Sequence, residues 1–69
     1  MPYAVNQDLP VSVRHVLPLH AQDIYREAFN HAFEAHAKEP DREIRAHRIA
    51  WAAVKRRYVK DEAGWVERT

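Results

Sequence analysis

Five histidines are the first residues of this sequence that could do chemistry, as metal ligands or as proton carriers: His15, His20, His31, His36 and His47. Two metal ligands on a helix must lie three or four residues apart, with further Cys, Asp or Glu ligands in support. His15 and His20 are five residues apart, and so are His31 and His36. That step turns about 140° around a helix, so neither pair shares a face. We therefore expect no metal site and no cofactor.

Nucleophilic catalysis has one candidate, Ser12, with His15 three residues later. A catalytic serine usually lies on a glycine-bearing turn, beside backbone N–H groups that bind the developing oxyanion. The chain has one glycine, Gly64, which is distant from Ser12 in the sequence. A phosphate-binding loop needs several glycines, so the sequence does not predict one. We therefore expect no enzymatic activity and assign no catalytic residue.

Positive charge is concentrated in the second half of the chain. Residues 1–40 carry three basic and five acidic side chains, whereas residues 41–69 carry eight basic and five acidic ones. The net charge of +1 therefore conceals an acidic first part and a basic second part. Six of these cations are candidate contacts for a negatively charged partner: Arg42, Arg45, Arg48, Lys55, Arg56 and Lys60.

A basic helix can bind the phosphates of nucleic acid, an acidic protein surface or anionic lipid headgroups. The sequence pI of about 8.2 is below the value of roughly 9 that is typical of a dedicated nucleic-acid domain. The acids Asp23, Glu27 and Glu34 could also neutralise part of the basic surface, which would leave it merely solvated. A third possibility is self-association through exposed aromatic residues such as Phe33 or Trp65.

Prolines divide the chain into three predicted helices, at residues 10–16, 19–38 and 41–60. Pro10 suits the first position of a helix, because its missing N–H needs no partner there. Pro18 separates the first helix from the second, since the residue before a proline is pushed out of the α region. Pro40 ends the second helix, and Asp41 is favoured at the start of the third.

Apolar residues recur at helical spacing and predict the core. The expected core residues are Ile24, Tyr25 and Phe29 on the second helix and Ile44, Trp51, Val54 and Tyr58 on the third, with His47 on the same face. Gly64 is the best candidate for a left-handed turn after the third helix. We expect the residues beyond it, 65–67, to pair with residues 3–5 as a two-stranded ribbon.

The expected fold class is therefore mainly α: a small three-helix domain of residues 1–69, with a short two-stranded antiparallel sheet that pairs the N- and C-terminal segments. The length of 69 residues allows one domain. There is no cysteine and no run of 18 apolar residues, so we expect no disulfide and no membrane span. The start of the chain lacks the basic and apolar regions of a signal peptide, and we expect a cytoplasmic location.

Two blocks of sequence resemble the ChaB family of bacterial cation transport regulators. The first runs from Asp8-Leu9-Pro10 to Pro18 and continues from His20 to Asn30. The second runs from Ala46 to Lys55 and is followed by Tyr58, Lys60 and Trp65. The chain differs from the family between the blocks, at 38–42, where family members can carry a longer charged insert.

The resemblance implies a three-helix fold with a short two-stranded sheet. It also implies a non-enzymatic cytoplasmic regulator or adaptor that binds a protein partner, the cytoplasmic side of a sodium/calcium–proton antiporter. No catalytic or cofactor residues are implied. Related domains occur beside nucleic-acid-binding modules, so the alternative function is a nucleic-acid-binding module that uses the basic third helix.

Overall fold

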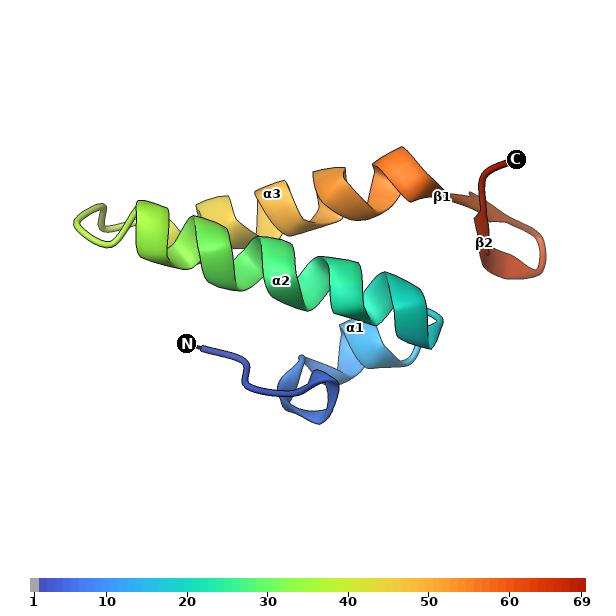
Figure 1. The fold of residues 1–69 in the computed structure, drawn as a ribbon, viewed down its shortest axis with the longest axis horizontal. Helices are drawn as coiled ribbons and strands as arrows, with labels where there is room; N and C mark the ends of the chain where they lie inside the picture. The colour runs from blue at the N-terminus through green and yellow to red at the C-terminus, as the bar shows by residue number, and fades with distance from the viewer. Residues whose placement is uncertain (1) are drawn as a thin grey trace.

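The computed structural model describes residues 2–69, and helices make up most of it. In chain order the elements are the 3₁₀ helix η1 (Asn6–Asp8), the helices α1 (Val11–Arg14), α2 (Leu19–Ala35) and α3 (Arg42–Arg57), and the strands β1 (Tyr58–Asp61) and β2 (Gly64–Glu67). Helices α2 and α3 run antiparallel along the long axis, α1 lies beside α2, and the strands extend from the end of α3 (Figure 1). The expected class of fold, mainly α with a two-stranded antiparallel sheet, is confirmed.

The prolines stand where the helices begin. Pro10 and Pro18 are the residues immediately before α1 and α2, and both have an extended ψ. Helix α2 ends at Ala35, three residues earlier than the expected 38, because the chain needs residues 36–41 to reverse direction. Within this turn the side chains of His36 and Glu39 bond to each other, and Pro40 keeps Glu39 out of the helical region.

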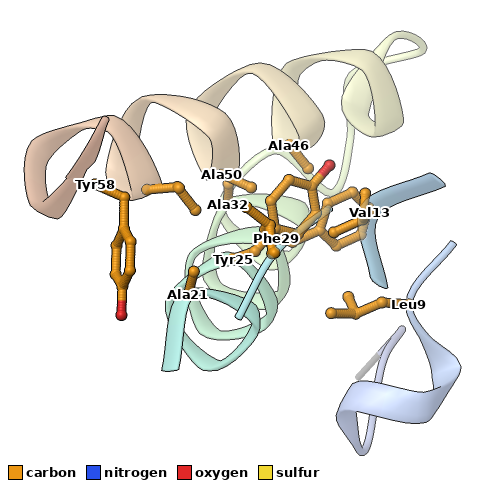
Figure 2. Packing of buried hydrophobic residues seen from close by; sticks show 11 residues of the cluster. Leu9, Val13, Ala21, Tyr25, Phe29, Ala32, Ala46, Ala50 and Tyr58 are labelled. Carbon is orange, nitrogen blue, oxygen red and sulfur yellow. The ribbon is translucent and has the colours of Figure 1, made fainter. Parts of the chain in front are cut away.

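The core lies where α2 faces α3 (Figure 2). Ala46, Ala50 and Val54 are fully buried along one side of α3, one helical turn apart. Tyr25 and Phe29 of α2, 0% and 1% exposed, lie against this side. Leu9, Val13 and Leu17 close the core from the α1 side. The small alanines let the helices approach closely, and the rings of α2 fill the remaining space.

The prediction is wrong for one expected core residue: Ile44 is 63% exposed and lies outside the core. The buried side of α3 is centred on Ala50, and Ile44 lies about 120° away from it around the helix. Of the other expected core residues, Tyr25, Phe29, Val54 and Tyr58 are buried, whereas Ile24 and Trp51 are partly buried at the edge of the core. A centre of alanines was missed because large side chains dominated the sequence pattern.

The expected pairing of the N- and C-terminal segments is wrong. Strand β2 pairs with the adjacent β1, with Val59 opposite Val66 and Lys60 opposite Trp65. The extended preference of Tyr58 and Val59 ends α3 at Arg57, three residues before the expected 60. A two-residue turn then closes a much shorter loop than a ribbon between the termini would need.

The turn and the far end of this hairpin are both fixed by hydrogen bonds. The Asp61 carboxylate accepts the N–H of Ala63 at 2.8 Å, and Gly64 supplies the positive φ of 114° that favours glycine. Arg68 follows β2 and returns to the end of α3. Its backbone N–H donates to the Arg57 carbonyl at 2.8 Å and its Nε donates to the Lys55 carbonyl at 2.9 Å. The hairpin is therefore tied to α3 at both ends.

The N-terminal segment is held by polar side chains of α2. Asn30 accepts the N–H of Tyr3 at 3.1 Å and donates to the carbonyl of Tyr3 at 2.8 Å, which imitates the pairing of a strand. The Tyr3 ring lies 4.7 Å from that of Phe29. Asn6 donates to Asp23 at 2.7 Å and accepts from Arg26 at 2.7 Å. These bonds account for the position of residues 3–6 without a second strand.

His47 lies in the aromatic part of the core. Its Nδ1 shares a hydrogen bond of 2.5 Å with the hydroxyl of Tyr25, and its ring centroid is 4.6 Å from that of Phe29. Burial, with a smaller contribution from Tyr3, raises the pKa of Tyr25 to about 12 from the ordinary 10.0. Within residues 2–69 no buried side-chain N or O atom lacks a hydrogen-bond partner. The polar atoms of the core are therefore satisfied.

No helix among residues 2–69 combines the length and the apolar character needed to cross a bilayer.

Phe29→Ala tests the core. Phe29 is 1% exposed and contacts aromatic rings from the N-terminal segment, α2 and α3. Its truncation should cost about 3–5 kcal/mol, which equals the roughly 3–5 kcal/mol that a core of this size supplies. We expect a largely unfolded protein by circular dichroism and urea titration at 25 °C. Leu19→Ala is the control, because Leu19 is 73% exposed; a folded Phe29→Ala protein would contradict this packing.

Tyr25→Phe tests the buried hydroxyl through pH. The folded protein holds the phenolic proton more tightly than the unfolded chain, so the stability that Tyr25 contributes is complete below pH 10 and is lost as the pH rises towards 12. Between pH 9 and pH 11 the free energy of unfolding of the parent should fall by about 1 kcal/mol more than that of Tyr25→Phe. Urea titrations across this range measure the difference, and equal slopes for the two proteins would contradict it.

Candidate functional site

The described residues offer no enclosed site for chemistry. Residues 2–69 form no detectable pocket, and no group of three or more His, Asp or Glu side chains among them is placed to hold a metal ion. His20 bonds through Nδ1 to the Tyr58 hydroxyl at 3.1 Å, and His36 bonds to Glu39. His15, immediately after α1, and His31, on α2, are both exposed. Three of the five histidines, His20, His36 and His47, are therefore engaged in separate hydrogen bonds within the fold.

Arg42, the first candidate contact residue, is engaged within the fold. Its guanidinium lies 3.6 Å from the centroid of the Phe33 ring. Its Nε and Nη2 donate to the Phe33 carbonyl at 3.2 and 3.0 Å. Since Phe33 is in the last turn of α2, Arg42 caps one carbonyl group, that of Phe33, at the negative end of that helix. Arg42 therefore joins α2 to α3, and its charge is less available to a partner.

Arg45 is engaged by acids of the turn between α2 and α3. Its Nε lies 3.0 and 3.1 Å from the two carboxylate oxygens of Asp41 and 3.3 Å from a carboxylate oxygen of Glu39. The hydrogen bond to Asp41, followed by the charges of Asp41 and Glu39, raises the pKa of Arg45. These exposed contacts are screened by water and are worth little for stability. They nevertheless offset the charge of Arg45 towards any partner.

The other four candidate cations have no salt-bridge partner within residues 2–69. Arg48, Lys55, Arg56 and Lys60 are exposed, and none of their side chains makes a salt bridge or hydrogen bond within residues 2–69. The acids of α2 do not neutralise them: Asp23 pairs with Arg26, and Glu27 and Glu34 make no salt bridge within residues 2–69. The structure thus divides the six candidates into two engaged cations at the start of α3 and four free ones farther along.

Three of the four free cations, Arg48, Lys55 and Lys60, lie beside two tryptophans that the sequence pattern did not bring together. The rings of Trp51 on α3 and Trp65 on β2 are partly buried, with centroids 5.6 Å apart. Lys60 stands opposite Trp65 in the sheet. The sequence placed residues 65–67 against the N-terminal segment, so it separated Trp65 from Lys60. A hairpin reading of residues 58–67, with aromatic and β-branched residues on both sides of a turn, would have found this neighbourhood.

Comparison with known proteins agrees with this architecture. The ChaB family model matches residues 9–68. The chain is 53% identical to the putative cation transport regulator ChaB of Escherichia coli (strain K12), over 72 aligned positions that cover 94% of this chain and 95% of the relative. The relative in Shigella flexneri, which has the same name, matches with the same identity and coverage.

A solved structure has the same fold. The NMR solution structure of the putative cation transport regulator ChaB superposes with a TM-score of 0.83 at 49% sequence identity, over 99% of this chain and 100% of that chain. The family model, the sequence identity and the superposition each extend over nearly the whole molecule. This chain belongs to the ChaB family.

Proposed function

We propose that this chain is a non-enzymatic regulatory domain that binds an acidic surface of a protein partner through the outer face of α3. The observation that carries the proposal is the set of four exposed cations that have no salt-bridge partner within residues 2–69: Arg48, Lys55, Arg56 and Lys60. Exposed like charges on one surface raise the rate of encounter with an oppositely charged partner. The names of the relatives support a role in regulating cation transport.

The partner that we propose is the cytoplasmic side of a sodium/calcium–proton antiporter, which places this domain in the cytoplasm. The family resemblance supports this choice of transporter. The distribution of charge supports the mode of binding, because the acids of residues 1–40 are kept on other elements while α3 presents its cations outward. Binding of this kind should weaken as salt concentration rises, since salt screens exposed charges.

Charge reversal tests this proposal directly. Arg48→Glu and Lys55→Glu, made separately, should each weaken binding to the purified antiporter by roughly tenfold. Both residues are exposed, so the circular dichroism spectrum should stay that of the parent. Lys38→Glu is the matched control, because it changes the net charge equally in the exposed turn before α3. Surface plasmon resonance with the full chain immobilised, at two salt concentrations, measures the effect.

Two results would oppose the proposal. If Lys38→Glu weakens binding as much as the α3 variants, net charge and not the α3 surface governs association. If the parent does not bind the antiporter at all, this partner is wrong.

Nucleic acid is the competing partner, because the same four cations could follow a phosphate backbone. Binding to duplex DNA should then fall with salt, with a slope of about −0.9 on a log–log plot for each neutralised phosphate. Fluorescence anisotropy with a labelled 20-base-pair duplex at two salt concentrations decides the matter. Binding of DNA with this dependence, together with no binding of the antiporter, would replace the protein partner by nucleic acid.

A further inference from the structure

Both tryptophans of the chain lie at one place on the surface. Trp51 and Trp65 are the two tryptophans of the sequence, and their rings are 5.6 Å apart with an angle of 32° between their planes. Each ring is partly buried and packs against the edge of the core. The end of α3 and the β-hairpin therefore share an apolar surface that the core covers only in part.

The indole N–H groups of this pair have no acceptor within the fold. Neither tryptophan makes a hydrogen bond in residues 2–69, and no buried side-chain nitrogen there lacks a partner. It follows that both indole nitrogens reach solvent. An indole nitrogen is a donor only, so the pair presents two donors that can bond to oxygen atoms of a partner.

Three cations and an exposed isoleucine lie on the same side of α3 or on the same face of the hairpin as the two tryptophan rings. Ile44, Arg48, Trp51 and Lys55 fall within about 60° of one another around α3, at 100° per residue. Ile44 is 63% exposed, although it lies on the same side of α3 as the partly buried Trp51. Lys60 stands opposite Trp65 across the sheet, so their side chains are on the same face of the hairpin. We call these six residues the tryptophan patch: Ile44, Arg48, Trp51, Lys55, Lys60 and Trp65.

We propose that the tryptophan patch binds an acidic peptide segment that carries bulky apolar side chains. This inference rests on the proposed function and names the part of the partner that is recognised. The carboxylates of the segment would meet Arg48, Lys55, Lys60 and the two indole N–H groups. Its apolar side chains would cover Ile44 and the exposed parts of the rings. Patches that combine aromatic anchors with charges at the rim are typical of protein interfaces.

The surrounding residues favour a peptide over a nucleic acid. Nucleobases bind by stacking on open aromatic faces. The ring of Trp51 already contacts that of Tyr25, with centroids 5.2 Å apart, and that of Trp65, with centroids 5.6 Å apart, so other rings of the fold occupy part of the surface on which a base would stack. Exposed Ile44 offers apolar contact but no stacking face. A row of phosphates gains nothing from that apolar contact.

Acidic residues limit where the peptide can lie. Glu67 stands opposite Tyr58, and Asp61 and Glu62 lie at the tip of the hairpin. Asp61 and Glu62 repel carboxylates beyond Lys60, and Glu67 repels them at the base of the hairpin, on the face that carries Trp65, so the segment should run mainly along α3 towards Ile44. The distance from Ile44 to Lys55 along the helix axis is about 16 Å, which five extended residues can span at about 3.3 Å each. The site therefore suits a short linear segment.

The test uses the intrinsic fluorescence of the full chain, since both of its tryptophans are in the patch. The probe is a 12-residue peptide of eight glutamates and four leucines, with blocked ends and no aromatic residue. We expect a saturable blue shift of the emission as the peptide covers the indoles. The matched probe with serine in place of leucine keeps the charge and should bind at least about tenfold more weakly, because it cannot bury apolar surface.

Neighbouring residues of α3 provide the variants. Lys55→Gln removes a patch cation and should weaken binding of the leucine peptide about fivefold, whereas Arg56→Gln removes the next cation, outside the patch, and should weaken it by less than about twofold. Trp65→Phe keeps a ring and removes one N–H donor, and should also weaken binding about fivefold. Circular dichroism of each variant verifies that the fold is kept.

The outcomes are distinguishable from those of the antiporter experiment. Equal losses for Lys55→Gln and Arg56→Gln, or equal affinity for the two peptides, would overturn the patch and leave a general electrostatic surface on α3. Tighter binding of single-stranded dT12 than of the leucine peptide would assign the patch to nucleic acid. A blue shift that depends on protein concentration without peptide would assign it to a second copy of this chain. Antiporter binding without peptide binding overturns the patch alone, and peptide binding without antiporter binding overturns the partner alone.

Discussion

The close contact between α2 and α3 is the constraint on which the rest of this small structure depends. Ala46 and Ala50 give α3 a side without bulk, and Tyr25 and Phe29 fill the space that the alanines leave. Every other segment attaches to this pair of helices. The N-terminal segment is held by Asn30, the α1 region closes one side with Leu9 and Val13, and the hairpin continues α3. A chain of 69 residues without a disulfide can fold in this way because its aromatic residues are concentrated at one contact.

The same contact determines which side of α3 remains exposed. Burying the alanine side of α3 leaves Arg48, Lys55, Arg56 and Ile44 exposed and Trp51 partly buried at the edge of the core. The two cations at the start of the helix are engaged within the fold: Arg42 donates to the Phe33 carbonyl, and Arg45 donates to the Asp41 carboxylate. Function, in our proposal, therefore depends on the later part of α3 and on the hairpin. The basic run of the sequence becomes two groups with different roles.

Sequence alone predicted the elements whose signals are local. These signals are the prolines before α1 and α2 and the helical spacing of Tyr25 and Phe29. They can be recognised without knowing which other element each helix contacts. The core face of α3 was displaced towards Ile44, because alanines give a weak hydrophobic signal and only contact with α2 shows that they are central. The partner of β2 was wrong because strand pairing depends on loop closure and on where α3 ends. The engaged states of Arg42 and Arg45 depend on the turn between the helices, which spacing does not describe.

The return of Arg68 to α3 has a consequence for local motion. Its two hydrogen bonds to the carbonyls of Arg57 and Lys55 join the end of the chain to the last turn of the helix. The end of a helix and a terminal strand usually fray independently of each other. Here fraying of either the end of α3 or β2 must break the same hydrogen bonds of Arg68. Amide hydrogens of the last turn of α3 and of β2 should therefore exchange with solvent as one cooperative unit. The position of Trp65 is in this way coupled to the integrity of the helix that carries Trp51.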